Sequence, residues 1–404
     1  MKSSTTICNF CSKDTTQVKK LLAGEGGVHI CIDCVELCHG IVTKDEKQES
    51  SIKKTSIFNV PTPREIHDNL DEHVISQDRA KKTLSVAIYN HYKRITSKTE
   101  TKLQKSNVLL AGPTGTGKTL LAQTLSKFLG VPMVVTDATV ITESGYAGDD
   151  AEVLIHKLFQ AADYNKEKAE QGIIYIDEID KKAKRNDYVS LSRDVSGEGV
   201  QQSLLKLMEG TVLAVPNKPQ RNPEKVDIDT SNILFVVGGA FIGLQDVVVN
   251  RLGKSKIGFN DDLDEEIEDW ETHLQTRDLV KYGLIPEFVG RLPSVNVLRP
   301  LNKNDLLKIL TEPKDSIIDQ IKELFLLDKI KIEFTITALE EIANIAIKEE
   351  LGARGLRKIL DERLLETQYQ LPELYKKGIR KIIINEQVIS RNATPQYIKG
   401  KDAE

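Results

Sequence analysis

The stretch "SNVLLAGPTGTGKT", residues 106–119, decides the fold, because a short apolar run passes directly into a glycine-rich turn. Its second part, residues 112–119, matches the G-x-x-x-x-G-K-[ST] pattern of a phosphate-binding loop. Leu121, Leu125 and Phe128 follow at helical spacing. A strand, this loop and a helix form the context that the pattern requires, so the sequence predicts a site for a nucleoside triphosphate.

The residues of this loop have distinct expected roles. Its glycines let backbone N–H groups wrap around the phosphates, and the following helix adds the positive end of its dipole. We expect Lys118 to contact the β- and γ-phosphates and Thr119 to ligate Mg²⁺. The residues predicted to bind the nucleotide in this loop are Gly112, Pro113, Thr114, Gly115, Thr116, Gly117, Lys118, Thr119 and Leu120.

A second motif, "IIYIDEID" at residues 173–180, places two acids at the end of an apolar run. Asp177 could hold Mg²⁺, and the adjacent Glu178 could polarise the water that attacks the γ-phosphate. Acids also favour helix starts, so a pair that caps a helix is the simpler alternative. Beside a phosphate-binding loop, the two acids favour hydrolysis of ATP over binding alone.

Strand patterns recur along the chain. They include "PMVVTDA" (132–138), the second motif and "NILFVVGG" (232–239), with helical stretches such as 198–209 between them. Such alternation predicts an α/β fold in which helices cover a parallel sheet. An amphipathic helix is expected earlier, over residues 77–94.

Helical patterns dominate from about residue 301 until the apolar run "KIIIN" (381–385), which predicts a second, mainly helical domain. The polar, charged stretch before the first helix is typical of a flexible linker. We therefore expect a zinc-binding domain at 1–45, a linker at 46–62, a large ATPase domain at 63–300 and a small domain at 301–404.

Four cysteines near the N-terminus follow the spacing C-x2-C-x19-C-x2-C: Cys8, Cys11, Cys31 and Cys34. Each pair can present two thiolates to one ion, so the two pairs predict a closed, structural Zn²⁺ site. Four unrelated thiols are the alternative, but paired spacing is a specific signal. Cys38 is expected to be a small buried hydrophobe and not a fifth ligand.

Composition and charge limit the remaining classes. Lys and Arg (56) nearly balance Asp and Glu (60), so no overall basic field attracts nucleic acid, and no direct nucleic-acid binding is expected. The first residues lack the apolar run of a signal peptide, and no apolar stretch is long enough to span a bilayer. We expect a cytoplasmic protein that does not bind membranes.

Two arginines in the second half are candidates for phosphoryl transfer. Arg291 lies in "GLIPEFVGRLP" (283–293), and Arg354 lies in "GARGLRK" (352–358). Either could be an ordinary surface charge. A guanidinium group at the γ-phosphate accelerates such reactions, whether its own subunit or a neighbouring one supplies it.

These segments together resemble the ClpX family of AAA+ ATPases, the ATP-dependent unfoldases that feed proteins to the ClpP peptidase. The resemblance covers nearly the whole chain and is carried by the four-cysteine module, both nucleotide motifs and four further segments. These are "PTPREIHDNLDEHVISQDRAKKTL" (61–84), "RDVSGEGVQQSLLKLMEGT" (193–211), "GLIPEFVGRLP" and "GARGLRK".

The resemblance implies roles for residues around the nucleotide. Val74 and Ile75, in "VISQ", would line the adenine pocket. Arg291 would be an arginine finger that reaches the nucleotide of the next subunit, which implies a ring, and the family works as a homohexamer. Arg354 would be the sensor arginine that couples the small domain to the nucleotide state.

The resemblance also implies how partners bind. In "GYAG" (145–148), Tyr146 would face a central pore and grip unfolded or tagged protein substrates. Without the resemblance, these residues favour a simple turn. A second pore loop would lie at 185–197. Ile257, Gly258 and Phe259 would dock on ClpP. The zinc domain would dimerise and bind substrates or adaptors.

The sequence departs from the family pattern in several places. Ala147 stands where the pore loop usually has valine, and Ser76 stands where a glycine is usual. The loop 217–227 lacks the histidine of an Arg-Lys-His tripeptide at the pore entrance. No polar sensor residue can be assigned at the end of "NILFVVGG".

Two alternatives remain beside a protein unfoldase. One is a DNA-acting ATPase, because some recombination proteins also combine a four-cysteine module with a phosphate-binding loop. The other is a remodelling chaperone or scaffold that uses ATP without serving a protease. Near-neutral charge disfavours the first.

Overall fold

The structure is a computed structural model of the chain. It describes residues 7–14, 17–18, 20–38, 60–97, 101, 103–142, 149–184, 197–217, 224–254, 269–391 and 393–400. The chain divides into two compact units, Met1–Asn59 and Val60–Glu404. Most of the expected linker, 46–62, lies outside the described residues.

The first unit is a small hairpin followed by a helix. Strands β1 (Leu21–Ala23) and β2 (His29–Cys31) pair antiparallel, and residues 32–38 are helical. Among its described residues, the only fully buried apolar side chains are Cys8 and Cys31. A unit with so little apolar core requires another source of stability.

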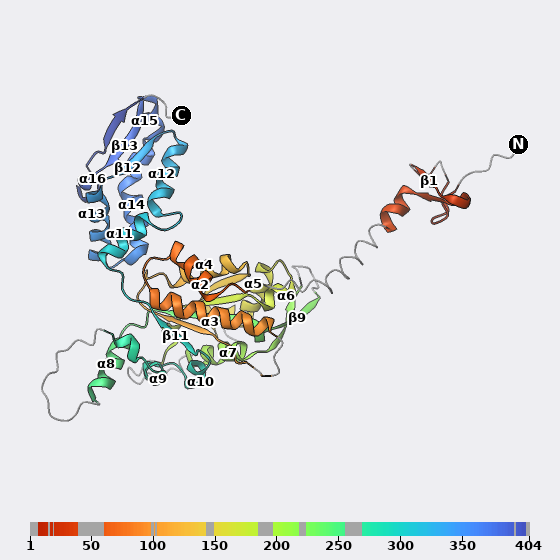
Figure 1. Ribbon diagram of the computed structural model, residues 1–404, viewed down its shortest axis with the longest axis horizontal. Helices are drawn as coiled ribbons and strands as arrows, with labels where there is room; N and C mark the ends of the chain where they lie inside the picture. The colour runs from red at the N-terminus through yellow and green to blue at the C-terminus, as the bar shows by residue number, and fades with distance from the viewer. Residues whose placement is uncertain are drawn as a thin grey trace. The chain divides into compact units, whose positions relative to one another are not determined.

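A five-stranded parallel sheet is the centre of the second unit (Figure 1). Every neighbouring pair is parallel, and the strands of highest apolar content, β3 and β10, are buried along their whole length. The order across the sheet is β11 (Ser294–Val297), β3 (Val108–Ala111), β10 (Leu234–Gly239), β7 (Ile173–Asp177) and β4 (Met133–Asp137). The predicted α/β fold is confirmed.

Helices cover both faces of this sheet. Side chains alternate along a strand, so Ile174 and Ile176 of β7 join the core under α5 (Val153–Ala161) and α7 (Gly197–Glu209). Tyr175 and Asp177 therefore point to the opposite face. That face is covered by α2 (Pro63–His73), α3 (Asp78–Thr96) and α4 (Lys118–Leu129), which lie together in Figure 1. The helix expected over 77–94 is α3.

Shorter elements complete this part of the unit. They are β5 (Ile141–Thr142), β6 (Asp149–Asp150), α6 (Lys166–Glu170), the hairpin β8 (Val212–Pro216) and β9 (Lys225–Asp229), α8 (Leu244–Lys254), α9 (Thr276–Tyr282) and α10 (Pro286–Gly290). No helix within the described ranges combines the length and apolarity that a bilayer crossing requires.

The last hundred residues have a hydrophobic core of their own. Their helices are α11 (Lys303–Thr311), α12 (Ile317–Leu327), α13 (Ile336–Lys348), α14 (Gly352–Tyr369), α15 (Leu371–Lys376) and α16 (Glu386–Arg391). A three-stranded sheet joins β12 (Lys331–Phe334), β13 (Ile379–Ile384) and β14 (Gln396–Lys399). The apolar run at 381–385 falls largely in β13, whereas the sequence did not indicate the four-residue strands β12 and β14, which pair with β13.

A buried ion pair joins α8 to α9. The guanidinium of Arg251 donates to both carboxylate oxygens of Asp278, at 2.7 and 3.0 Å, and to the carbonyl of His273 at 2.6 Å. Asp278 is only 1% exposed. The ion pair therefore joins described helices on either side of the segment 255–268, which lies outside the described residues.

We predict that Asp278→Ala destabilises the protein by about 3 kcal/mol, because it leaves the Arg251 guanidinium without its buried partner. Lys166→Ala is the control. It removes an exposed partner of Glu170 at 3.7 Å and should change stability by less than about 0.5 kcal/mol. Urea denaturation of both variants measures the difference. Equal, small losses would show that the Arg251–Asp278 pair does not stabilise the fold.

Candidate functional site

The phosphate-binding loop connects β3, which ends at Ala111, to α4, which begins at Lys118. The predicted strand, loop and helix are therefore present. Gly115 and Gly117 adopt φ angles of 82° and 98°, which side chains other than glycine disfavour. A Cβ on Gly115 would also lie 3.2 Å from the backbone nitrogen of Ala353. The loop therefore runs directly against the start of α14.

Lys118 is held by the carbonyls of its own loop. Its Nζ donates to the carbonyl oxygens of Gly112, at 2.6 Å, and Pro113, at 2.9 Å. Burial lowers the pKa of Lys118; the charge of Arg354 adds to this, and the charge of Asp177 opposes it. A phosphate at this point would supply the negative charge that the buried ammonium lacks.

Asp177 lies at the end of β7, opposite the start of α4. Its Oδ2 accepts a hydrogen bond from the Thr119 hydroxyl at 3.1 Å, and its Oδ1 accepts one from the Glu178 backbone N–H at 3.0 Å. A hydroxyl beside a carboxylate is a donor set that suits Mg²⁺, which prefers oxygen ligands and keeps several waters. Thr119 and Asp177 therefore fit the predicted magnesium ligands.

Glu178 follows in an unusual backbone conformation. Its φ is 55°, and its side chain is exposed on the wall of a cavity beside the phosphate-binding loop. A glutamate in the left-handed region carries strain of about 1 kcal/mol. This conformation turns the carboxylate away from the buried strand and toward the space beside the phosphate-binding loop.

A cavity of about 540 Å³ lies between the phosphate-binding loop and the C-terminal helices, a size typical of ligand sites. Of the predicted residues, those that line it are Thr114, Gly115, Gly117, Lys118, Thr119, Leu120, Asp177, Glu178 and Arg354. The first turn of α14 therefore brings Arg354 into the same site as the two nucleotide motifs. Their separation along the sequence gave no sign of this.

Other predicted residues lie away from this cavity. Pro113 and Thr116 line a smaller cavity of about 170 Å³ on the other side of the loop, next to Gly352. Gly112, Val74 and Ile75 line neither of the two cavities, although Val74 lies 3.6 Å from the point where a Cβ on Gly117 would be.

Arg291 also lies away from the cavity. It follows α10, and its guanidinium donates to Oε1 of Glu209 at 2.6 Å, with both side chains about half exposed. Within this chain, Arg291 therefore does not reach the nucleotide site.

The sequence did not identify the wall of the cavity that α11 and α12 supply. Ile309, Ile317 and Gln320 line the cavity from this side. Apolar residues at helical spacing indicate only that a helix buries one face, so no local signal distinguished these side chains from ordinary core positions.

The turn at Ser76 has a backbone conformation that favours glycine. Ser76 and Gln77 adopt φ angles of 57° and 64°, in the left-handed region that favours glycine. The Ser76 hydroxyl donates to the carboxylate of Asp305. Gln77 exchanges two hydrogen bonds with the backbone of Arg299, at 2.8 and 2.9 Å. These bonds fix the turn to the segment that leads into α11.

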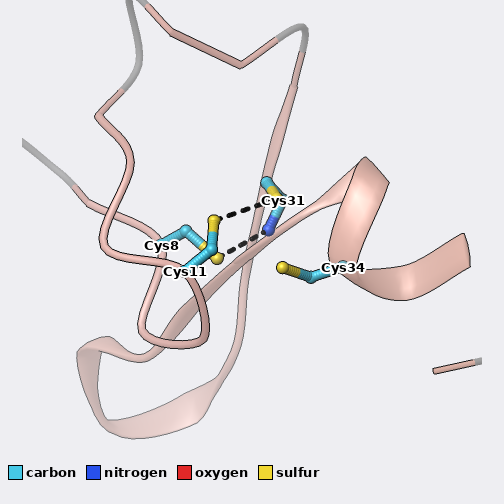
Figure 2. A group of neighbouring side chains, drawn as sticks. All are labelled: Cys8, Cys11, Cys31 and Cys34. Atoms are coloured by element: carbon cyan, nitrogen blue, oxygen red, sulfur yellow. Dashed lines mark hydrogen bonds between the residues drawn. The ribbon is translucent and has the colours of Figure 1, made fainter. Parts of the chain in front are cut away.

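The four cysteines of the first unit come together in one cluster. Figure 2 shows their side chains pointing toward one another, from the first loop, from β2 and from the helix at 32–38. All four sulfur atoms lie within 4.8 Å of one another, and the sulfurs of Cys11 and Cys31 are 3.7 Å apart. Sulfurs bound tetrahedrally to Zn²⁺ at about 2.3 Å lie about 3.8 Å apart, so the cluster fits this ion.

Backbone N–H groups stabilise thiolates in this cluster. The Cys31 N–H donates to the sulfur of Cys8 at 3.2 Å. Burial would raise the pKa of Cys8, but the amides of Cys11, Cys31 and Phe10 and the Cys11 side chain lower this pKa to about 6. Cys38 is not in the cluster, as expected, but it is partly exposed, so the expectation that it is buried was wrong.

Several predicted residues lie outside the described residues. They are Tyr146 of the expected pore loop, Ile257, Gly258 and Phe259 of the expected docking segment, and most of the expected second pore loop and of the loop 217–227. The structure therefore adds nothing to the expectations for these segments.

We predict that the purified protein carries one zinc ion per chain, and that Cys31→Ser abolishes zinc binding and unfolds the first unit, because this unit lacks an apolar core. Cys38→Ser is the matched control and should retain the metal. Metal analysis and circular dichroism test both variants. A zinc content unchanged in Cys31→Ser would contradict the site.

Known families match three parts of the chain. The family described as "ClpX C4-type zinc finger" matches residues 6–44, and the family "AAA domain (Cdc48 subfamily)" matches residues 103–295. The family "C-terminal, D2-small domain, of ClpB protein" matches residues 301–376. The first two matches contain the four cysteines and both nucleotide motifs.

A curated relative matches the chain nearly from end to end. It is the ATP-dependent Clp protease ATP-binding subunit ClpX of Treponema denticola, which is 44% identical over 406 aligned residues. The alignment covers 98% of this chain and 97% of the relative. On this similarity, and on the matches to the zinc-finger and AAA families, the chain belongs to the ClpX family of AAA+ ATPases.

Proposed function

We propose that this protein is an ATP-dependent protein unfoldase that hydrolyses ATP in the cavity beside Lys118 and serves a Clp protease as its ATP-binding subunit. The observation that carries the proposal is the convergence of Lys118, Thr119, Asp177 and Glu178 in one cavity with Arg354. Membership of the ClpX family supports both the ATPase activity and the link to a protease. It also disfavours a DNA-acting ATPase.

The residues of the cavity have complementary roles in this proposal. Lys118 would exchange its two carbonyl partners for the β- and γ-phosphates. Thr119 and Asp177 would hold Mg²⁺, which supplies positive charge to the phosphates when it is bound. Glu178, exposed at the cavity wall, would polarise the attacking water, and the main-chain N–H groups of the loop would bind phosphate oxygens.

The contact between the phosphate-binding loop and α14 supports a coupling role for Arg354. Gly115 lies directly against the start of α14, and Arg354 lies on that same first turn. A change of charge in the cavity would therefore act on α14 both through the guanidinium and through the packed backbone. In this way, hydrolysis would move residues 301–404 relative to residues 63–300, the two domains that we propose for the ATPase.

The remaining roles rest on the family resemblance. Arg291 is half exposed and away from its own cavity, so it would complete the site of a neighbouring subunit in a homohexamer. Tyr146 would grip unfolded or tagged substrates in the pore. Ile257, Gly258 and Phe259 would dock on ClpP. The zinc domain at 1–45 would dimerise and bind substrates or adaptors, and the protein would act in the cytoplasm.

We predict that Glu178→Gln retains ATP binding but lowers ATP turnover at least about 100-fold and abolishes unfolding, because the amide cannot act as a base.

Tyr146→Ala should keep ATP turnover and lose unfolding. Glu167→Gln, an exposed acid of α6, is the control. ATP hydrolysis and loss of fluorescence from a tagged, stable reporter measure the two activities. A Glu178→Gln variant that still unfolds the reporter would refute the proposal.

We predict that deletion of residues 256–261 abolishes degradation with ClpP but leaves ATP-dependent unfolding intact. Deletion of residues 262–267 removes the same length from the acidic part of the segment and is the matched control. Both deletions leave the Arg251–Asp278 pair in place. Degradation that survives the first deletion would show that Ile257, Gly258 and Phe259 do not form the contact.

A further inference from the structure

Tyr175, in the middle of β7, has a hydroxyl group that the interactions described so far do not explain. The side chain is fully buried. Among the residues that the structure describes, none forms a hydrogen bond with its hydroxyl oxygen. A buried, unpaired hydroxyl destabilises a fold, so its presence requires a reason.

A buried tyrosine on the neighbouring helix provides the comparison. Tyr92 of α3 is also buried, and its hydroxyl donates to the carbonyl oxygen of Gln171 at 3.1 Å. The fold can therefore pair a buried phenol when only packing is needed. Tyr175 is different, because its hydroxyl is directed at the nucleotide site.

The position of the hydroxyl is defined by the end of β10. A Cβ on Gly238 would lie 2.3 Å from the hydroxyl oxygen of Tyr175 and 3.2 Å from Oδ1 of Asp177. The hydroxyl therefore occupies the space that a side chain at position 238 would fill. This is the end of "NILFVVGG", where the sequence offers no polar residue to sense the nucleotide.

The surroundings of the hydroxyl are polar groups of the ATP site. Burial is the main cause that raises the pKa of Tyr175, the negative charge of Asp177 adds to it, and the Thr119 side chain opposes it. A phenol hydroxyl this close to a carboxylate can donate a hydrogen bond to it. In the present arrangement Asp177 already accepts from Thr119 and from the backbone of Glu178.

We propose that Tyr175 is a positioning residue, whose hydroxyl donates a hydrogen bond to the Asp177 carboxylate when the nucleotide site is occupied. In the occupied site, the Thr119 hydroxyl would ligate the metal ion beside Asp177. The hydrogen bond that Thr119 now donates to the Asp177 carboxylate would then be lost or weakened. The Tyr175 hydroxyl, which lies in the space left by the missing side chain of Gly238, would then hold the Asp177 carboxylate in place by a hydrogen bond. This inference rests on the proposed ATP site and adds to it a residue of β7 that does not touch the nucleotide.

The test compares Tyr175→Phe with Tyr92→Phe in the full-length protein, because each change removes one buried hydroxyl and nothing else. Binding of a fluorescent ATP analogue is measured with Mg²⁺ and with EDTA, together with the melting temperature of the nucleotide-free protein. We expect Tyr175→Phe to weaken binding about 5- to 10-fold with Mg²⁺ and to leave binding in EDTA unchanged. The melting temperature should stay the same or rise, because the hydroxyl that is removed has no partner in the nucleotide-free protein. Tyr92→Phe should lower the melting temperature and leave both affinities unchanged.

The possible results separate this inference from the proposed function. If the wild-type protein does not bind the analogue with Mg²⁺, the proposed ATP site is wrong. If the wild-type protein binds it and Tyr175→Phe binds equally well with Mg²⁺, only the role of Tyr175 is wrong. Equal weakening with Mg²⁺ and with EDTA, or a lowered melting temperature alone, would show a merely structural role.

A second variant tests the geometry. Gly238→Ala places a methyl group 2.3 Å from the Tyr175 hydroxyl oxygen, so it must displace that oxygen. We expect Gly238→Ala to weaken Mg²⁺-dependent binding more in the wild-type background than in Tyr175→Phe. Equal effects in both backgrounds would show that position 238 does not act through the hydroxyl.

Discussion

The constraint on which the second unit depends is the close contact between the phosphate-binding loop and the start of α14. A Cβ on Gly115 would lie 3.2 Å from both the nitrogen of Ala353 and the carbonyl oxygen of Leu351, so only a glycine lets the two backbones meet. This contact makes one cavity from the sheet on one side and the C-terminal helices on the other. A movement of the phosphate-binding loop therefore changes the packing at the start of α14.

Much of the fold could be predicted, because the central strands carry strong local signals. Strands β3 and β10 are buried on both faces, which gives continuous apolar runs that any sequence reading can find. The strands β12 and β14 could not be predicted in the same way. Each has only four residues, and each pairs with β13. For β12, this partner lies far along the chain, so no local pattern reveals the pairing.

In the candidate site, too, residues in local motifs could be predicted, and residues placed by packing between distant elements could not. Lys118, Thr119, Asp177 and Glu178 follow from motifs whose chemistry is local, so their convergence was expected from the order of a parallel sheet. The walls from α11 and α12 and the hydroxyl of Tyr175 depend on packing between distant elements. In "IIYIDEID" the tyrosine reads as one more apolar residue of a strand, and only the glycines at the end of β10 show why its hydroxyl lies where it does.

Strained backbone occurs both in the nucleotide site and in the turn that contacts the start of the C-terminal helices. Glu178 lies on the wall of the nucleotide cavity, and Ser76 and Gln77 lie in the turn before α3. All three adopt positive φ angles, each unfavourable by about 1 kcal/mol. Ser76 and Gln77 are held by Asp305 and Arg299, in and before the segment that begins the C-terminal helices. A shift of that segment must strain or release the turn at 76–77. Hydrogen bonds therefore join the turn at 76–77 to the start of the C-terminal part of the chain, and a movement of one changes the energy of the other.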